Sequence, residues 1–432
     1  MTNFSNVSIK SFLKEREDRF KPEEANEKGL KRLEKIDFSG NIHLVDDKET
    51  RTGMILVKKG DLVISGINVE KGAIAVYNGE TDVLATIHYS SYSFDKSKID
   101  VEYFKWFLRS KTFKDIVNLS IKGGIKTELK PKKFLPLIIP LPDLDIQIKI
   151  RKKLDSVEDE INELGNLNFK NEDYIQKLRQ SILQEAVSGK IVSQDPKDEP
   201  ASELLKKIKA EKERLIREKK AKRDKDVPIT SEISFQIPNN WAFVRLTSLV
   251  SILGDGIHGT PNYSDEGEYY FVNGNNLNEG KIDIKPNTKR VSQEEYYKYK
   301  KELNDKTIFV SINGTIGNVA FYNNEKLILG KSVCYFNLLD GILKEYLKIL
   351  IKTNYFLGYA LDSATGTTIK NVSLESMRMF LVPLPPLPEQ LRIVQKVDQL
   401  IKLCDELEEK VKENQKNSEL LMESVLKEAF EV

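Results

Sequence analysis

The sequence is poor in the residues that most often carry catalysis and metal binding. Its 432 residues include three histidines, His43, His88 and His258, and two cysteines, Cys334 and Cys404. The histidines are far apart in the sequence, which argues against a metal site or a histidine-based nucleophilic triad. Both cysteines lie in apolar patterns, so we expect reduced core residues and no disulfide. This composition predicts a chain without a metal or a cofactor.

Long hydrophobic runs are also missing. No apolar run reaches the length of a membrane span, and the N-terminus lacks the basic-then-apolar order of a signal peptide. We therefore expect a cytoplasmic protein. The 68 basic and 66 acidic residues leave a net charge of +2. Any basic surface must therefore come from segregation of charge within the chain.

Motifs for covalent chemistry are incomplete. The sequence LGKS at 329–332 ends like a phosphate-binding loop, but Glu325 stands where that motif needs its first glycine. The sequence NGTIG at 313–317 lacks the GxGxxG form and lies between strand-like stretches, which predicts a hairpin or a bulge. The Asn/Asp-Pro-Pro-Tyr/Phe motif of amino-methyltransferases is absent. We expect that the chain is not an enzyme.

What the chain does contain is a long internal repeat. Residues 140–186 return as residues 383–429 at a constant offset of 243, with 16 identities in 47 ungapped positions. The identities include Gln147/Gln390 and Asp155/Asp398. A repeat of this length predicts two copies of one architectural unit.

Each copy has the pattern of a long helix that follows a proline-rich start. Apolar residues step by three and four along both, as in a coiled-coil seam: Ile150, Leu154, Val157, Ile161 and Leu164, then Ile393, Val397, Leu400, Cys404 and Leu407. For a single copy, an ordinary bundle helix would remain an alternative. Because each stripe is narrow, it needs a partner of the same kind, and the other copy is the simplest one.

The repeat divides the chain into four segments. We expect a globular domain at 1–139, a long helix with a charged connecting helix at 140–232, a second globular domain at 233–382 and a second long helix at 383–432. In the first domain, the stretch 54–79 alternates like strands, with hairpin turns at Gly60-Asp61 and Asn78-Gly79. One amphipathic helix is predicted from Val101 to Leu119.

The charged connecting segment begins as a helix at Ala201 and carries a basic run from Lys206 to Lys225. This run could bind nucleic acid. Interleaved glutamates favour a solvated helical face instead.

Three polar segments are suited to binding. They are a lysine-rich loop with Lys122, Lys126, Lys130, Lys132 and Lys133; the matching loop of the second half with Thr365, Thr367, Thr368 and Lys370; and a patch with His258, Thr260, Asn262, Tyr263, Asn275 and Asn276. Lysines neutralise phosphates, and asparagine pairs with adenine. Asparagine and glycine clusters are also typical of turns, and the run at 269–271 is typical of a buried strand. We treat these residues as DNA-binding candidates.

Several motifs together resemble one family. They are PLPPLPEQLRIVQKVDQLI from Pro383, PLPDLDIQIKI from Pro140, SILQEAVSGKIVSQDPKDEPASELL from Ser181 and PNNWAFVRL from Pro238. Together they resemble the DNA-specificity subunits of type I restriction-modification systems, over nearly the whole chain. The first copy departs from the pattern, with Asp145-Ile146 in place of Pro388-Glu389 and no counterpart of Trp241.

The resemblance implies an α+β fold in which two α/β target-recognition domains are separated by two long antiparallel coiled-coil helices. Each domain would bind one half of a bipartite duplex DNA target. The partners would be two methyltransferase (modification) subunits that methylate adenine and restriction/translocase subunits. S-adenosylmethionine and ATP would be used by those partners and not by this chain.

Two other functional classes remain open. One is a coiled-coil adaptor with two protein-binding heads, whose affinity for DNA would not depend on sequence. The other is a nuclease or transferase with an unrecognised motif, which predicts turnover by the purified chain.

Overall fold

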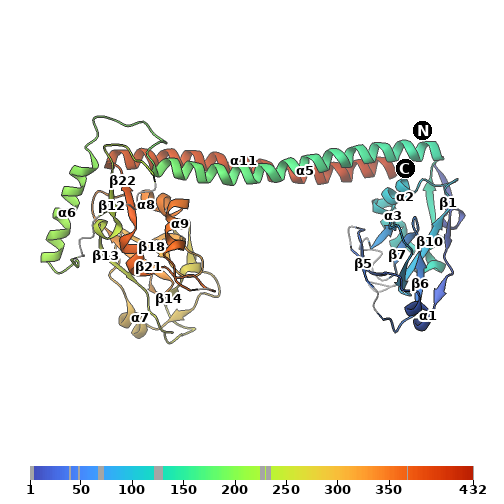
Figure 1. Ribbon diagram of the computed structural model, residues 1–432, viewed down its shortest axis with the longest axis horizontal. Coiled ribbons are helices and arrows are strands. Elements are labelled where there is room, and N and C mark those ends of the chain that lie inside the picture. Colours follow the sequence, from blue (N-terminus) through green and yellow to red (C-terminus); the bar gives the residue numbers. More distant parts are fainter. Residues whose placement is uncertain are drawn as a thin grey trace. The chain divides into compact units, whose positions relative to one another are not determined.

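The computed structural model describes residues 4–37, 40–46, 49–66, 73–120, 130–223, 229, 235–366 and 368–431 (Figure 1). The chain forms two compact units, which we call unit 1 (Met1–Lys170 with Val411–Val432) and unit 2 (Asn171–Lys410). This division runs through the long helices, so the domain limits expected at 139, 232 and 382 stay predictions.

Unit 1 is built on two sheets. The four-stranded antiparallel sheet has the order β2 (Leu13–Glu15), β10 (Tyr89–Phe94), β7 (Leu62–Ser65) and β8 (Ile74–Val76). The five-stranded sheet has the order β3 (Arg19–Phe20), β6 (Met54–Val57), β9 (Val83–Thr86), β4 (Arg32–Ile36) and β5 (Ile42–Val45). β1 (Ser5–Ser8) pairs with β11 (Ile138–Leu141). The shorter helices are α1 (Pro22–Glu27), α2 (Val101–Arg109), α3 (Lys111–Ser120) and α4 (Pro131–Phe134).

Unit 2 has a four-stranded antiparallel sheet in the order β13 (Val250–Asp255), β21 (Val333–Leu338), β18 (Thr307–Ser311) and β19 (Val319–Phe321). A three-stranded sheet has the order β17 (Arg290–Val291), β14 (Tyr269–Val272) and β20 (Leu327–Leu329). β12 (Ala242–Arg245) pairs with β22 (Leu381–Leu384), and β15 (Leu277–Asn278) with β16 (Lys281–Ile282). The shorter helices are α6 (Ala201–Arg217), α7 (Gln293–Tyr299), α8 (Lys344–Ile351), α9 (Asn354–Asp362) and α10 (Leu374–Met379).

The two units repeat one framework, as the sequence repeat predicts. The order β2-β10-β7-β8 in unit 1 corresponds to β13-β21-β18-β19 in unit 2. In both units two helices follow this sheet, and a short antiparallel pair, β1 with β11 or β12 with β22, leads into a long helix. The framework is therefore an α+β fold with an internal repeat.

The long helices are α5 (Leu144–Val187) and α11 (Leu387–Phe430), each of 44 residues. In unit 1, Lys153 forms an ion pair with Glu428 at 3.0 Å. In unit 2, Arg179 contacts Asp405 at 2.6 Å. Within each unit, an early part of one long helix thus lies beside a late part of the other, and the segments run antiparallel.

Burial along the predicted seam is uneven. Leu154, Ile393, Val397 and Cys404 are buried, Ile150, Val157, Ile161 and Leu400 are half-buried, and Leu164 and Leu407 are each 46% exposed. The seam prediction is wrong for the last two. Along α5 the buried or half-buried positions recur every seventh residue, at Leu154, Ile161, Asn168, Ile175 and Ile182, and Leu164 does not belong to this series.

Two local predictions for the first domain are wrong. Gly60 does adopt a turn, with φ +84°, but β6 and β7 on either side of it belong to different sheets. The same holds for β8 and β9 around Asn78-Gly79, because the chain crosses between the sheets at both turns. In contrast, the hairpin predicted at 313–317 joins the paired strands β18 and β19.

The predicted helix at 101–119 is two helices, α2 and α3. Ser110 has extended backbone angles (φ −69°, ψ 156°). Its hydroxyl donates to the carbonyl of Phe107 at 2.6 Å and accepts from the amide of Phe113 at 3.2 Å, which ends one helix and caps the next. Thr353 does the same between α8 and α9.

The core of unit 1 includes a residue from the end of the chain. Phe430 of α11 is 1% exposed, and its ring lies 5.5 Å from that of Tyr103 and 5.6 Å from that of Phe107. In unit 2, Phe309 and Phe336 on neighbouring strands are fully buried. Both cysteines are free and buried, as predicted.

Candidate functional site

Four segments of unit 2 converge on a pocket of about 430 Å³, which we call the polar pocket after the polar side chains described below. They are the end of β13 with the residues after it, the residue after β18, the connection from β20 to β21, and the segment that leads into α10. The pocket is lined by Asp255, His258, Ile312, Lys331, Asn371, Val372, Ser373 and Leu374. Five of these residues carry polar side chains and three carry apolar ones, so the pocket can offer a ligand both hydrogen bonds and apolar contacts.

The loop beside the pocket is held by its own backbone. Thr365 and Asn371 exchange two hydrogen bonds of 2.9 Å, and Gly366 turns the chain with φ +92°. The side chain of Asn313 donates to Oδ1 of Asn371 at 3.1 Å, which ties the loop to the β18–β19 hairpin. The loop therefore presents Ile369, which is 60% exposed, from a fixed base.

The charged groups of the pocket differ in how they are held. The carboxylate of Asp255 contacts Nε2 of His258 at 2.7 Å and so orients an imidazole whose side chain is 75% exposed. Lys331 is exposed and has no ion pair among the residues that the structure describes. The pocket thus offers an ammonium group, an oriented imidazole, a carboxylate and the Asn371 amide.

The structure brings some predicted residues together and separates others. The pocket brings together His258 and the segment that follows Lys370. Four other predicted residues are exposed and lie close to these in the sequence: Thr260, Thr365, Thr368 and Lys370. Thr367 lies outside the described residues.

The asparagines of the predicted patch have structural partners. The amide of Asn276 is buried and donates to the carbonyl of Asp283 and to Thr288, and the carbonyl of Asn275 accepts from Lys285. Through these bonds the two residues hold the segment that follows β16 against the connection from β14 to β15. Of the patch, Asn276 is therefore not carried into the site proposed below.

Two further predicted residues, Asn262 and Tyr263, follow His258 of the pocket in the sequence. Asn262 is exposed but held by Glu295, and Tyr263 is 45% exposed with its ring 5.9 Å from that of Phe271. The ring of Tyr263 is therefore partly exposed beside Phe271.

Sequence reasoning missed Asp255, Lys331, Asn371 and Ser373. Lys331 was considered only as part of an incomplete phosphate-binding loop. The available signal was the strand-like pattern on both sides of LGKS, which places Lys331 in a connection at one end of a sheet.

In unit 1, Lys130, Lys132 and Lys133 are exposed at α4, and Lys122 and Lys126 lie outside the described residues. A separate groove of about 1000 Å³ lies between β5, β8 and α2. In it the Trp106 indole donates to Asp155 at 2.8 Å, and the guanidinium of Arg109 lies 4.2 Å above the Trp106 ring. Sequence reasoning did not identify this groove.

Other kinds of site are absent from the part of the chain that the structure describes. No group of three or more histidine, cysteine, aspartate or glutamate residues there could hold a metal ion. No described helix has the length and apolarity to cross a bilayer.

Comparison with known proteins finds similar sequences in one family. Residues 238–416 match the type I restriction modification DNA specificity domain. The specificity subunit of type I restriction enzyme EcoAI from Escherichia coli is 31% identical over 261 residues, which are 57% of this chain and 43% of that protein. The putative specificity subunit of MjaX from Methanocaldococcus jannaschii is 25% identical over 406 residues, 88% of this chain and 82% of that protein. The chain thus spans less than half of the EcoAI subunit.

The fold has solved counterparts. The HsdS subunit from Thermoanaerobacter tengcongensis aligns with a TM-score of 0.59 at 16% identity, over 99% of this chain and 96% of that one. A chain from a type I restriction-modification complex aligns with a TM-score of 0.61 at 16% identity, over 100% and 98%. These structural matches show the fold, and the sequence relatives show that the chain is similar to the DNA-specificity subunits of type I restriction-modification systems.

Proposed function

We propose that this chain recognises a bipartite DNA sequence, one part with each unit, and directs an associated adenine methyltransferase and an ATP-dependent restriction subunit to it. The observation that carries the proposal is the repeated framework with different surfaces. The sheet order and the helices that follow it recur in both units, whereas the polar pocket lies in unit 2 and the Trp106 groove in unit 1. One scaffold with two different surfaces suits the reading of two different half-sites.

The chemistry of the pocket fits base edges in a major groove. A lysine ammonium pairs with guanine, an asparagine amide with adenine, and a carboxylate accepts from the amino group of cytosine. Lys331, Asn371 and Asp255 supply these three groups. His258, Thr368 and Lys370 are further candidates for contacts with bases or phosphates.

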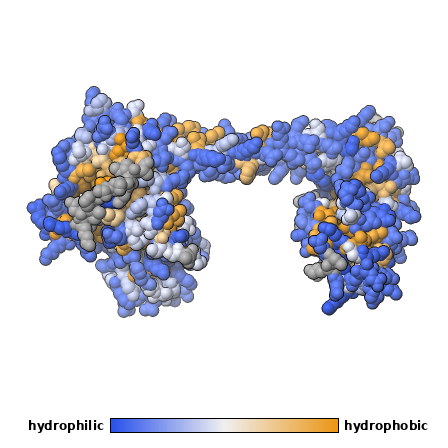
Figure 2. All heavy atoms as spheres, viewed as in Figure 1, coloured by the Kyte–Doolittle hydropathy of each residue, from blue (hydrophilic) through white to orange (hydrophobic). Residues whose placement is uncertain are grey.

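Exposed leucines on the long helices support the proposal that two copies of one partner bind, one at each unit. Leu164 and Leu421 in unit 1 are 46% and 48% exposed, and Leu178 and Leu407 in unit 2 are 45% and 46% exposed. At the offset of 243, Leu164 corresponds to Leu407 and Leu178 to Leu421. Hydrophobic residues are visible on the surface of these helices (Figure 2). Equivalent apolar patches fit two copies of one methyltransferase subunit. The chain itself would carry out no covalent step, and the partners would use S-adenosylmethionine and ATP.

The test is methylation-site mapping in cells that contain the chain and its methyltransferase. The wild type is expected to produce adenine methylation at a two-part sequence with a fixed gap. The double variant Lys331→Ala/Asn371→Ala is expected to lose or relax one half-site while the other half stays required. Lys197→Ala, in an exposed loop of unit 2, is the control and should leave the site unchanged.

Two results would count against the proposal. Absence of any two-part mark, with the methyltransferase expressed and assembled, would favour an adaptor whose DNA affinity does not depend on sequence. A mark that is identical in the wild type and the double variant would remove the pocket from the recognition surface.

A further inference from the structure

One short part of unit 2, from residue 281 to residue 301, carries an excess of positive charge. Between residues 281 and 301, seven residues are basic and three are acidic, a net charge of +4 in a chain whose total is +2. The basic residues are Lys281, Lys285, Lys289, Arg290, Lys298, Lys300 and Lys301. This segment contains β17 and α7, so the charge is carried by ordered structure.

The basic run that begins at Lys206 in α6 carries a larger positive charge, but ion pairs with glutamates hold several of its cations. Lys206 pairs with Glu203 at 2.7 Å, and Arg214 pairs with Glu211 and Glu218. Lys207 likewise contacts Glu199 at 2.7 Å. These pairs engage the charge of several cations in the run. This arrangement agrees with the solvated face that the sequence favoured for α6.

Several cations of the 281–301 segment have no ion pair among the described residues and lie over aromatic rings, and three of them use rings of Tyr263, β14 and α7. Lys289 lies 5.8 Å from the ring centre of Tyr263, Arg290 lies 5.3 Å from that of Tyr270, and Lys300 lies 4.9 Å from that of Tyr297. A ring attracts a cation without cancelling its charge. The rings therefore hold these cations in place while their charge stays available.

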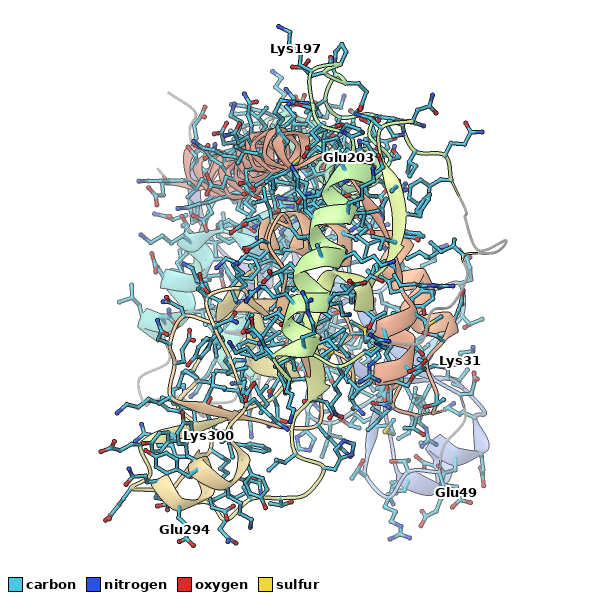
Figure 3. The ribbon with its side chains drawn as sticks, turned by 90° about the vertical axis from the view of Figure 1, so that its left-hand side faces the viewer. Lys31, Glu49, Lys197, Glu203, Glu294 and Lys300 are labelled. Atoms are coloured by element: carbon cyan, nitrogen blue, oxygen red, sulfur yellow. The ribbon has the colours of Figure 1, made fainter. Side chains whose placement is uncertain are left out.

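The rings join β14, β17 and α7 into one surface. Tyr269 of β14 stacks on Tyr296 of α7 at 4.1 Å, and Tyr296 contacts Tyr297 at 5.4 Å. Tyr270 pairs with Arg290 across β14 and β17. Figure 3 labels Lys300 on this part of unit 2, away from Glu203 at the start of α6. We call Lys289, Arg290 and Lys300 with these rings the basic–aromatic surface.

This surface is linked to the polar pocket by a short segment. His258 lies in the pocket, and five residues later Tyr263 forms a β-bridge with Val291 of β17. A duplex with a base edge in the pocket would therefore have backbone phosphates within reach of the surface. Lys289, Arg290 and Lys300 have no anionic partner among the described residues. Consecutive phosphates of a DNA strand would supply such partners.

We infer that the basic–aromatic surface binds the phosphate backbone of the DNA next to the bases read in the pocket, and contributes affinity without reading sequence. The inference rests on the proposed function. Each phosphate neutralised by a lysine or arginine releases condensed counterions, so this contribution weakens as salt is added. A phosphate contact fixes the position of the duplex and carries no base information.

The test uses the full-length chain with its methyltransferase subunit and two duplexes, one with the mapped target and one scrambled. The affinity for both is measured over a series of salt concentrations. The triple variant Lys289→Gln/Arg290→Gln/Lys300→Gln removes three charges. The matched control is Lys206→Gln/Lys207→Gln/Arg214→Gln in α6, which removes the same number of charges that are already paired.

The slope of log affinity against log salt is expected to become shallower in the triple variant, by about one for each phosphate that the variant no longer neutralises. The ratio of affinities for target and scrambled duplex should stay at the wild-type value. The α6 control should keep the wild-type slope, which separates local phosphate binding from the change in total charge.

Three outcomes would overturn the inference. A wild-type slope in the triple variant would remove the surface from the DNA interface. A lower ratio of target to scrambled affinity would mean that the surface reads bases. Loss of methyltransferase binding with an unchanged slope would make it a protein-docking surface. If the wild type itself shows no preference for the target, the proposed function fails, and the slope comparison on scrambled DNA still decides the inference.

Discussion

Gln147 and Gln390, which are 243 positions apart, make the same three hydrogen bonds in their respective units. Both side chains are fully buried near the start of a long helix. Oε1 of Gln147 accepts from the amide of Asp100 at 2.9 Å, and its Nε2 donates to the carbonyls of Lys98 at 3.2 Å and Pro142 at 2.8 Å. This glutamine thus connects the start of α5 to the segment before α2.

The partners of Gln390 lie at the equivalent positions. It accepts from the amide of Leu343 at 2.9 Å and donates to the carbonyls of Gly341 at 3.2 Å and Pro385 at 3.1 Å. All the partners are backbone groups, so the arrangement does not require that the neighbouring side chains match. The identity at this position in the repeat therefore has a structural cause.

Replacing Gln147 by alanine is expected to destabilise unit 1 by about 2 to 4 kcal/mol, because buried backbone groups lose their partners. Hydrogen exchange followed by mass spectrometry should show faster exchange in unit 1 and unchanged exchange in the sheets of unit 2. Gln390→Ala should produce the reverse pattern. Equal effects of one variant on both units would contradict the assignment.

Replacing Phe430 by alanine is expected to destabilise unit 1 by about 3 to 5 kcal/mol, because a large buried ring leaves a cavity. The ring contacts Tyr103 and Phe107, and the carbonyl of Phe430 accepts from Thr112 at 3.0 Å. Chemical unfolding monitored by hydrogen exchange would measure the effect.

The matched control for Phe430 is Val187, which ends α5 and is fully buried in unit 2. Val187→Ala should weaken unit 2 and spare unit 1. If Phe430→Ala leaves exchange in α2 and α3 at the wild-type rate, the C-terminal residues do not belong to the core of unit 1.

Glu389, at the start of α11, provides a pH-dependent prediction for unit 2. Burial raises the pKa of its carboxyl above the ordinary value of 4.5, despite the hydrogen bond that Gln194 donates at 2.6 Å. Arg392, paired with Asp198 at 2.7 Å, also faces this group. The folded chain therefore holds the Glu389 proton more tightly than the unfolded chain does.

The stabilising contribution of Glu389 is accordingly present below pH 4.5 and is lost as pH rises through the folded-state pKa. Urea unfolding of the wild type and of Glu389→Gln at several pH values would measure it. As pH increases from 4.5 toward neutrality, the unfolding free energy of the wild type should fall relative to that of Glu389→Gln. A difference that stays constant over this range would show that the carboxyl ionises freely in the fold.

Local pattern was enough to predict the long helices and the repeat. The apolar spacing of both copies and the constant offset appear in α5 and α11, whose ends are also 243 residues apart. The start of α6 at Ala201 and the hairpin at 313–317 followed from local signals as well. These features depend on residues within a few turns of one another, so the sequence carries their signal directly.

Tertiary structure alone decided the sheets and the pocket. Gly60 marks a turn in the sequence, but only strand order shows that its two neighbouring strands enter different sheets. Asp255, Lys331 and Asn371 are far apart in the chain and line one pocket because β13, β21 and the loop before α10 meet there. Likewise, the exposure of Leu164 depends on which face of α5 its neighbour covers. Such contacts join distant residues, so no local pattern in the chain encodes them.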